Sequence, residues 1–315
     1  MSNRCMICGK SVSTGDQYHS TCCKSFFGTA LPPVLPYGKN DLNTLASELI
    51  NNNMTVTGVQ KKLSLHLSAE AKQQRLTFVN LWGEFILKPQ VESYSELPEN
   101  EFLTMCLADM LKIKTVPHAL IRMKSGDSAY ITKRIDRSGD RKIHMEDMCQ
   151  LSEKATEDKY RGSLEQVGKI VNKYCSNRLL DALRFFELVL FAYITGNSDM
   201  HLKNFSLIEY SDGIALVPAY DLLNTRLVIS EKDDPDESAL SINGKRRKIG
   251  FSDFFEFGLN LSLSEKQIEN VFKRFFSTEA QLILGIENSF LCDEGKQRYK
   301  KIFLDRLEKL RAATK

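Results

Sequence analysis

Four polar side chains, three of them in one short segment, have the types and spacing that phosphoryl transfer requires. The segment Gly196-Asn197-Ser198-Asp199-Met200-His201-Leu202-Lys203-Asn204 follows an apolar run, and another carboxylate, Asp221, lies downstream. In phosphoryl transfer one carboxylate takes the proton of the attacking hydroxyl, while an amide oxygen and a second carboxylate hold the magnesium ion that neutralises phosphate charge. We therefore interpret Asp199 as a candidate base and Asn204 and Asp221 as candidate Mg²⁺ ligands. The plainer alternative for Asp221 is a turn-forming aspartate.

A lysine and a glutamate further upstream could direct positive charge at the phosphates. Lys88 ends the strand-like run Phe85–Pro89, and Glu101 lies in the first turns of a helix that Pro98 opens. An ion pair between them would aim the ammonium at the α- and β-phosphates of a nucleotide. The alternatives are a solvated edge lysine and a glutamate that only favours the helix N-terminus through its dipole.

A turn that contains one glycine precedes the strand-like segment that begins at Lys62. Val56-Thr57-Gly58-Val59-Gln60-Lys61-Lys62 leads into a segment that alternates apolar and polar residues. Such a turn can lay backbone N–H groups along a phosphate. The segment contains a single glycine, so the turn alone is a weak signal.

The N-terminal residues have the spacing of a zinc site. Cys5-x-x-Cys8 is followed by His19-x-x-Cys22, and each short pair can supply two of the four ligands of a tetrahedral ion. The neighbouring Cys23 leaves the ligand assignment ambiguous. The alternative is a reduced, metal-free pair of turns.

The elements that must position these residues follow from apolar periodicity and from capping and turn signals. Pro-rich residues 26–36 predict an extended connector without regular structure. A hairpin is expected over 239–249 with its turn at Asn243-Gly244, and the basic run 245–248 on one arm reads as a solvated edge. Strands are expected at 62–67, 75–79, 84–88, 118–123, 129–134, 205–209 and 213–217, and helices at 41–50, from Pro98 to about Leu111, at 163–174 and 178–195, from Ser264, and at 299–310.

The order of these elements predicts an α+β fold with two lobes. We expect an N-terminal Cys/His segment and connector over 1–50, a β-rich lobe over 51–138 and a mostly helical lobe over 139–315. The polar, flexible stretch Ile135–Gly139 marks the boundary between the lobes.

Composition limits the class of protein. The chain has 315 residues, 42% of them hydrophobic, and a net charge of +3, which is too nearly balanced to indicate nucleic acid as the main partner. The most apolar run, Leu188–Ile194, is far shorter than the ~20 residues that cross a bilayer. The N-terminus has no apolar signal region, so we expect a cytoplasmic protein with reduced thiols.

Taken together, the motifs resemble the HipA family of bacterial serine/threonine kinases, the toxins of toxin–antitoxin modules. The resemblance covers residue 55 to the C-terminus. The matching strings are T-G-V-Q-K-K-L at 57–63, F-I-L-K-P at 85–89, E-N-E at 99–101, R-I-D-R at 134–137, H-M-E-D-M-C-Q at 144–150, G-N-S-D-M-H-L-K-N-F-S-L at 196–207 and P-A-Y-D at 218–221.

The resemblance implies a protein-kinase-like fold and a role for each matching residue. Asp199 would be the catalytic base, Asn204 and Asp221 the magnesium ligands, and Lys88 the lysine that clamps the phosphates of ATP. His201 would lie near the phosphates, and Lys133 to Ile135 would offer hinge backbone to adenine. The loop Thr55-Val56-Thr57-Gly58, with Val59 and Gln60, would cover the phosphates. Phosphate on Thr55 or Thr57 would repel the nucleotide, which makes autophosphorylation there a means of control.

Two departures from the family pattern affect the expected partners and contacts. Met145 replaces a glutamine that can touch nucleotide in relatives. Only some fifty residues precede the phosphate loop, which resembles the short, HipT-like form of the family. We therefore expect a small separate protein that supplies the missing N-terminal subdomain, a helix-turn-helix antitoxin, and DNA contact only through these partners.

The sequence thus predicts a protein kinase toxin that uses ATP and Mg²⁺. The family implies an aminoacyl-tRNA synthetase as the protein substrate. One alternative is a small-molecule or lipid-headgroup kinase, since D-x-H-x-x-N also occurs in lipid kinases. The other is a catalytically silent binding module in a repressor complex, against which the full set of Lys88, Asp199, Asn204 and Asp221 argues.

Overall fold

The computed structural model describes residues 3–38, 41, 62–70, 73–79, 83–139 and 141–312. The chain divides into two compact units. Unit 1 comprises Met1–Cys106, Val116–Arg137 and Asn288–Leu291, and unit 2 comprises Leu107–Thr115, Ser138–Glu287 and Cys292–Lys315. The helix expected at 41–50 and the turn at 55–60 lie outside the described residues.

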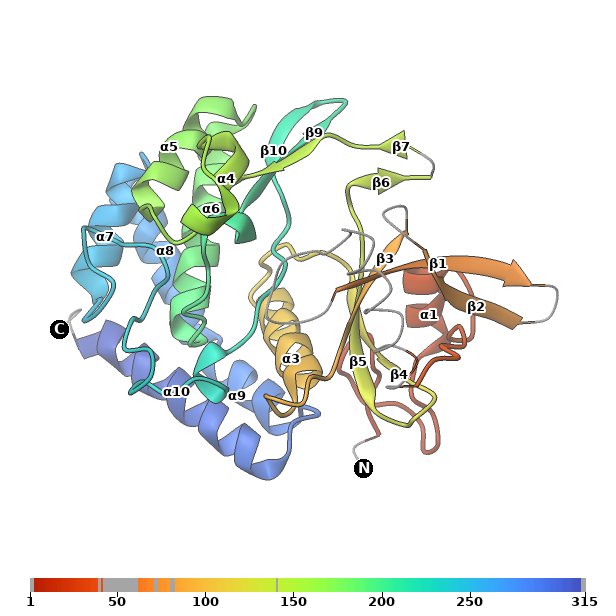
Figure 1. Ribbon diagram of the computed structural model, residues 1–315. Helices are drawn as coiled ribbons and strands as arrows, with labels where there is room; N and C mark the ends of the chain where they lie inside the picture. The colour runs from red at the N-terminus through yellow and green to blue at the C-terminus, as the bar shows by residue number, and fades with distance from the viewer. Residues whose placement is uncertain are drawn as a thin grey trace. The chain divides into compact units, whose positions relative to one another are not determined.

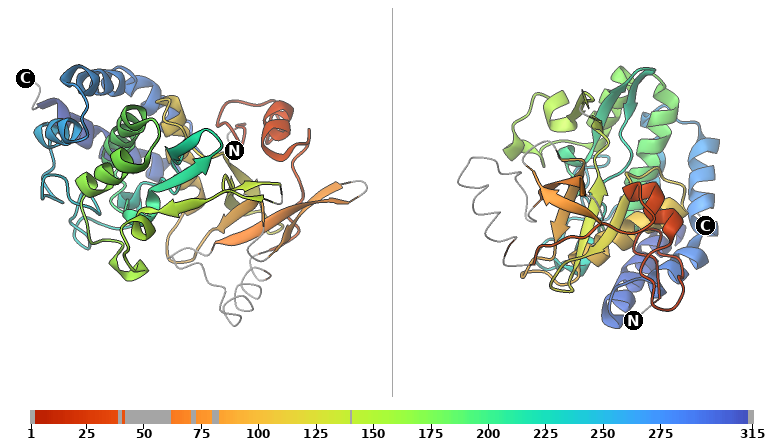
Figure 2. Two further views of the ribbon diagram at one scale, coloured as in Figure 1. Left: turned by 90° about the horizontal axis from the view of Figure 1, so that it is seen from above. Right: turned by 90° about the vertical axis from the view of Figure 1, so that its right-hand side faces the viewer.

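Unit 1 is built on a five-stranded antiparallel sheet with the strand order β2-β1-β3-β5-β4 (Figure 1). The strands predicted by alternation of apolar residues are confirmed, with ends shifted by a few residues. They are β1 (Leu63–Glu70), β2 (Gln73–Phe78), β3 (Phe85–Pro89), β4 (His118–Arg122) and β5 (Ser128–Lys133). β1 pairs with β3 only through Leu63–Leu65, so β1 and β2 extend from the sheet as a hairpin (Figure 2).

Two helices cover opposite faces of this sheet. Phe85 and Leu87 of β3 share a buried apolar cluster with Phe26 and Phe27 of α1 (Ser20–Phe27). Side chains alternate along a strand, so Lys88 points to the other face, where α3 (Leu97–Met110) lies. The lysine is thereby buried beside a helix while its strand neighbours build the core.

The connector expected over 26–36 needs one correction. Phe26 and Phe27 form the last turn of α1 because their rings pack on Phe85, with centroids 5.7 and 6.0 Å away. The helix ends at Gly28, whose left-handed φ of 80° suits glycine. Beyond it the chain has no helix up to Gly38, and Val34 forms a parallel bridge with Arg75.

Unit 2 is mostly helical, and α6 (Arg178–Ile194) runs through its core with most of its residues buried. Capping boxes at Ser163/Gln166 and Ser264/Gln267 open two helices where the sequence predicted them. The helices are α4 (Met148–Leu151), α5 (Leu164–Tyr174), α6 (Arg178–Ile194), α7 (Phe251–Asn260), α8 (Glu265–Ser277), α9 (Glu279–Glu287) and α10 (Asp293–Ala312). A three-stranded sheet β10-β9-β8 accompanies them, formed by β8 (Met145–Asp147), β9 (Ser206–Tyr210) and β10 (Gly213–Leu216), and a two-stranded ribbon pairs β6 (Arg137–Ser138) with β7 (Arg141–Lys142).

The predicted hairpin over 239–249 is reduced to its turn. Asn243 and Gly244 have φ of 49° and 73°, but only the bridge between Ile242 and Lys245 follows. The basic side chains of the second arm bind other segments instead: Lys245 pairs with Asp253 and Arg247 with Asp236. Both basic side chains stay more than half exposed, at 52% and 61%, which agrees with a solvated basic run, although the run is not the edge of a hairpin.

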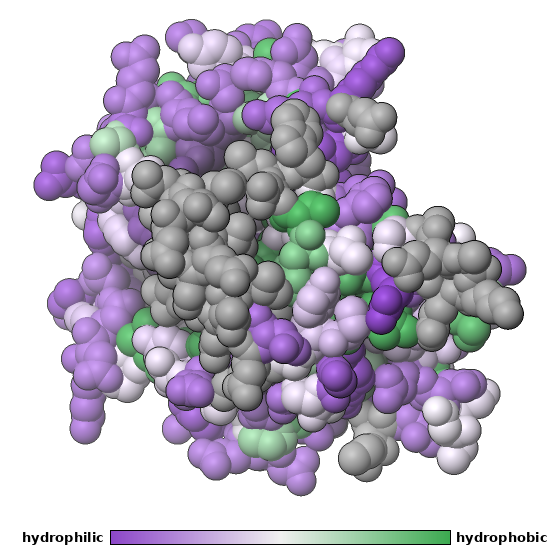
Figure 3. All heavy atoms as spheres, turned by 45° about the vertical axis from the view of Figure 1, so that its right-hand side comes forward, coloured by the Kyte–Doolittle hydropathy of each residue, from purple (hydrophilic) through white to green (hydrophobic). Residues whose placement is uncertain are grey.

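The described surface is mostly hydrophilic on the face that Figure 3 shows, with smaller apolar areas between the charged groups. Within the described part of the chain, no helix is both long and apolar enough to span a bilayer. The α+β class predicted from the sequence is confirmed by these two units.

Candidate active site

The polar loop of unit 2 starts where the buried helix α6 stops. Thr195 caps the helix, and Gly196 follows in the left-handed region with φ of 73°. A Cβ on this glycine would lie 2.8 Å from Ile302 Cγ2 and 2.9 Å from Asn224 Oδ1. Both the backbone conformation and the packing therefore require glycine at this position.

Hydrogen bonds then fix the first half of the loop to the segment around Thr225. The Thr225 hydroxyl donates to the carbonyl of Gly196 at 3.0 Å and accepts from the N–H of Ser198 at 2.9 Å. The Asn197 N–H donates to Ala192 O at 2.8 Å, and its side-chain oxygen accepts from the Asp199 N–H at 3.2 Å. These bonds fix the backbone that leads to Asp199.

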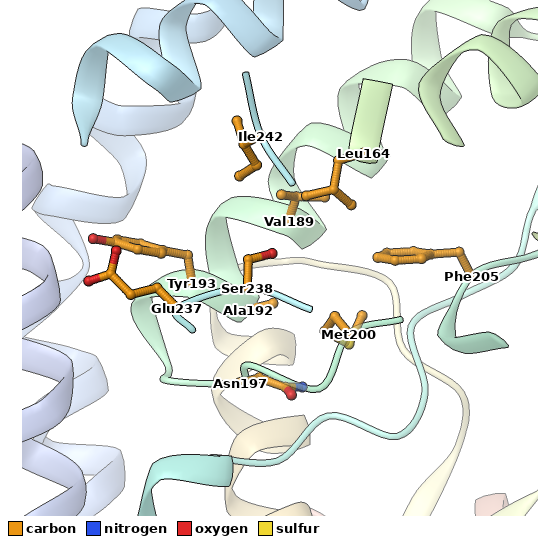
Figure 4. A pocket seen from close by; sticks show the side chains of 10 residues that line it. All are labelled: Leu164, Val189, Ala192, Tyr193, Asn197, Met200, Phe205, Glu237, Ser238 and Ile242. Atoms are coloured by element: carbon orange, nitrogen blue, oxygen red, sulfur yellow. The ribbon is translucent and has the colours of Figure 1, made fainter. Parts of the chain in front are cut away.

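Buried apolar side chains of the loop face α6. Met200 and Phe205 are buried, and together with Asn197 they line a small pocket against Val189 and Ala192 of α6 (Figure 4). Most polar side chains of the loop are buried as well, among them Asn197, Ser198 and His201. Asp199 lies between two buried residues and is itself exposed.

The Asp199 carboxylate has a partner that the sequence did not reveal. The Tyr160 hydroxyl donates to Asp199 Oδ1 at 2.7 Å, and the Tyr160 ring lies edge-on to His201 with centroids 5.1 Å apart. Burial, and then the hydrogen bond to Asp199, raise the pKa of the Tyr160 phenol, which keeps it a donor. The Asp199 carboxylate can therefore accept a hydrogen bond from a hydroxyl group.

His201 is a buried, neutral imidazole. Burial lowers its pKa, while the nearby carboxylates of Asp199 and Asp221 oppose that shift. Its Nδ1 is buried without a hydrogen-bond partner among the described residues. These interactions place both carboxylates near one imidazole, which brings the predicted base and one predicted metal ligand together.

Asn204 and Asp221 are joined through their chain neighbours. Asn204 closes a 3₁₀ turn (Leu202–Asn204), and its Oδ1 accepts from the His201 N–H at 3.1 Å. After the β9–β10 hairpin the chain returns, and the Tyr220 hydroxyl donates to Lys203 O at 2.9 Å. Asp221 has φ of 56°, a conformation that few non-glycine residues adopt and that is common at functional sites.

In unit 1, Lys88 and Glu101 form the ion pair that the sequence predicted. Lys88 Nζ lies 2.5 Å from Glu101 Oε1, and the two side chains are only 5% and 3% exposed. The ammonium also lies 5.3 Å from the ring centre of Tyr130, its cross-strand neighbour on β5. Lys88 is therefore buried and oriented, which excludes the alternative of a solvated edge lysine.

Part of the backbone in the predicted hinge, residues 133–135, is already hydrogen-bonded within the protein. The Lys133 N–H donates to Pro117 O at 2.9 Å, so an adenine ring could use the Lys133 carbonyl or the backbone of Ile135 but not that N–H. Asp136 next to it accepts from Arg134 Nε at 2.9 Å and from Arg137 Nη1 at 2.6 Å. This cluster fixes the end of β5.

Several predicted site residues cannot be placed. Thr55, Thr57, Gly58, Val59 and Gln60 lie outside the described residues, so their roles stay predictions. The four predicted zinc ligands Cys5, Cys8, His19 and Cys22 do come together in unit 1, where their ligand atoms all lie within 4.8 Å of one another.

Sequence reasoning missed three contributors to the site in unit 2: Tyr160, Thr225 and Tyr220. Each acts on a residue far away in the chain, so no local pattern identifies it. The positive φ of Asp221 also has no sequence signal, because aspartate occurs in many conformations.

Comparisons with known proteins find a family profile and several relatives that match this chain. The profile of the family described as HipA-like C-terminal domain matches residues 54–282. A Haemophilus influenzae protein named "Putative kinase" is 26% identical over 262 residues, which cover 75% of each chain. The "Serine/threonine-protein kinase toxin HipA" of Shewanella oneidensis is 28% identical over 191 residues, 54% of this chain and 43% of that protein.

Two solved structures share the fold. HipA from the Shewanella oneidensis complex of HipA, HipB and operator DNA superposes with a TM-score of 0.68 at 21% identity, covering 96% of this chain and 80% of that one. The Helicobacter pylori proinflammatory kinase CtkA gives 0.54 at 14% identity, covering 79% of this chain and 93% of that one. The two-lobed, kinase-like α+β fold predicted from the sequence is confirmed.

Proposed function

The chain belongs to the family of HipA-like C-terminal domains, and on this premise we propose that it is an ATP-dependent kinase that phosphorylates serine or threonine in a protein. The single observation that carries the proposal is the loop after α6. Asp199, His201 and Asn204 lie on it, and Asp221 returns to it through the β9–β10 hairpin.

The donor set of this loop fits magnesium. Asn204 and Asp221 offer amide and carboxylate oxygens, which are the ligands that Mg²⁺ prefers. When bound, Mg²⁺ and ATP supply the γ-phosphate and the charge neutralisation of its transfer.

The remaining steps belong to side chains of this protein. Asp199 takes the proton of the acceptor hydroxyl, as its present hydrogen bond with the Tyr160 hydroxyl illustrates. Lys88, held by Glu101, contributes the positive charge that binds phosphates. The neutral His201, next to Asp199 in the loop of unit 2, can form a hydrogen bond without adding charge.

The substrate and the control of the enzyme are finer parts of the proposal. We take an aminoacyl-tRNA synthetase as the protein substrate because the motifs resemble the HipA toxins. We also assign autophosphorylation to Thr55 or Thr57. Mass spectrometry of protein purified after expression should find phosphate on one of these threonines, and no phosphate in the Asp199→Asn variant.

A helix-turn-helix antitoxin is the proposed partner, because the HipA of the Shewanella structure is bound to HipB and operator DNA. DNA contact would then be indirect. A pull-down from the native host should recover this antitoxin and the predicted small protein, and recovery of neither would remove the partner proposal without touching the kinase proposal.

Nucleotide binding provides the most direct test of the kinase proposal. ATP with Mg²⁺ should raise the melting temperature, and Asp221→Ala should abolish the Mg²⁺-dependent part of that shift. Radiolabelled ATP in a cell lysate should then label a discrete protein band. Labelled lipid or small molecule without a protein band would favour the alternative kinase class.

Growth arrest separates an enzyme from a silent binding module. Expression of the wild type should arrest growth and Asp199→Asn should relieve the arrest. If both proteins behave alike, the kinase proposal fails and the repressor-complex alternative gains support.

A further inference from the structure

A second chemical site lies in unit 1, apart from the kinase residues and before the segment that the family profile matches. Cys8 Sγ is 3.4 Å and Cys22 Sγ is 3.6 Å from His19 Nδ1, and Cys5 Sγ lies within 4.8 Å of all three. Tetrahedral zinc, with Zn–S and Zn–N bonds of about 2.3 and 2.0–2.1 Å, requires S···N separations of about 3.6 Å. The separations of His19 Nδ1 from the Cys8 and Cys22 sulfurs are therefore already close to those that zinc would impose.

The histidine is also oriented as a ligand. Its Nε2 lies 2.9 Å from the carbonyl oxygen of Ser11 and can only donate to that acceptor. This assigns the ring proton to Nε2 and leaves the lone pair of Nδ1 facing the thiols. A hydrogen bond from the non-ligating nitrogen to a carbonyl is the usual support of a metal-bound histidine.

The backbone forms the two short turns that such a site uses. The Cys5 N–H donates to Lys10 O at 2.8 Å and the Gly9 N–H to Cys5 O at 2.9 Å, so the chain wraps around the first cysteine pair. The His19 N–H also points at Cys5 Sγ, 3.5 Å away. The second pair lies at the start of α1, which begins at Ser20.

The structure removes the ambiguity between the two adjacent cysteines. Cys23 is fully buried in the apolar cluster of the sheet with Phe26 and Phe27, whereas Cys22 is partly exposed on the side of His19. A helix turns about 100° per residue, so two neighbouring side chains cannot both face one ion.

From this geometry we propose that Cys5, Cys8, His19 and Cys22 bind one Zn²⁺ as a structural site. Four protein ligands close the coordination sphere and leave no open position, which is the property of structural rather than catalytic zinc. The site does not depend on the proposed kinase function.

Zinc here would fasten the N-terminal segment to the sheet that carries Lys88. Next to the ligands, the Leu120 N–H of β4 donates to Met6 O at 2.6 Å, and the Tyr18 hydroxyl donates to Leu120 O at 3.1 Å. At the other end of α1, Phe26 and Phe27 pack on Phe85. α1 would thus be attached to the sheet at both ends, through the zinc site at its start and through the two phenylalanines at its end.

Two adjacent, equivalent substitutions test the assignment. Cys22→Ala and Cys23→Ala should be purified without a metal-affinity tag and under reducing conditions, beside the wild type. Elemental analysis should find one zinc per chain in the wild type and in Cys23→Ala, and almost none in Cys22→Ala. Zinc retained by Cys22→Ala at the wild-type level would overturn the proposal.

Cobalt keeps the test decisive if Cys22→Ala does not fold. Wild-type protein reconstituted with Co²⁺ should show thiolate-to-cobalt charge transfer and the intense visible bands of tetrahedral coordination. A pale octahedral spectrum, or failure of the reduced wild type to take up either metal, would refute the site. Chelation of zinc should also lower the melting temperature, because metal binding to a folded site is folding free energy.

Discussion

The two units hold the charged residues proposed for the kinase reaction in different environments. In unit 1 the ammonium of Lys88 is buried and already neutralised by Glu101 at 2.5 Å. In unit 2 the carboxylate of Asp199 is exposed, and the buried His201 has no partner for its Nδ1 among the described residues. The ammonium of Lys88 therefore already has its counter-charge within the protein, whereas the loop of unit 2 leaves groups that a ligand can use. The contrast predicts that loss of Lys88, which we also propose to bind phosphates, lowers stability as well as activity, whereas loss of the exposed Asp199 lowers activity with little loss of stability.

The largest expected effect is on turnover. Asp199→Asn keeps the shape of the side chain but removes the base, so phosphoryl transfer should fall about 10²- to 10⁴-fold with little change in melting temperature. Asp212→Asn, in the exposed turn of the β9–β10 hairpin, is the control and should leave turnover unchanged. A fall in stability that matched the fall in activity would contradict the contrast.

Breaking the ion pair of unit 1 should cost stability. Lys88→Met leaves the Glu101 carboxylate buried without its ammonium partner and should lower the free energy of unfolding by about 3–5 kcal/mol. Lys296→Met removes the surface pair with Asp293, which is fully exposed, and should leave the free energy of unfolding nearly unchanged. Equal losses in urea unfolding would show that the pair in unit 1 is solvated.

A smaller effect is expected where α6 passes into the loop. Gly196→Ala forces a side chain into a left-handed residue and against Asn224 and Ile302, so its cost should exceed the about 1–2 kcal/mol of the conformation alone. Gly244→Ala is a matched control, because Gly244 has the same φ of 73° with open space around it. The difference between the two variants measures the packing term.

The smallest effect is a difference in acid sensitivity between the units. Burial lowers the pKa of His201 below its usual 6.5, so below about pH 6.5 the unfolded chain binds more protons than the folded one and stability falls. Burial alone would raise the pKa of Asp136, but Arg134 and Arg137 outweigh it and hold it below 3.8. Stability from Asp136 is therefore present above about pH 3.8 and lost only below it.

Urea unfolding followed by circular dichroism across this pH range checks both windows. His201→Gln should flatten the decline that begins near pH 6.5, and Asp136→Asn should change only the most acidic part. If His201→Gln left the upper window unchanged, the imidazole would not be the group that titrates there.

Local signals in the sequence predicted the elements that position the site. Ser163 and Ser264 with their glutamines marked helix starts, and Gly196 marked the end of α6, because caps and left-handed residues depend on the side chain at that position. The order of Lys88 and Glu101 also sufficed to predict their ion pair, since a strand and the next helix commonly pack together.

Contacts between distant segments could not be predicted. Tyr160 reaches Asp199 across 39 residues, and nothing near either residue marks that pairing. Phe26 and Phe27 stay helical because Phe85 packs on them, an interaction that overrides the extended tendency of the prolines that follow. The arm after Asn243-Gly244 loses its strand because its lysine and arginine find acidic partners elsewhere.

The hydrogen bond between Tyr160 and Asp199 makes this tyrosine an internal competitor of the acceptor. Under the proposed function, an acceptor hydroxyl that takes the place of Tyr160 at Asp199 Oδ1 replaces one hydrogen bond with another, so this exchange is nearly neutral and gives the acceptor little affinity. Recognition of a substrate would then depend on contacts away from the reacting hydroxyl.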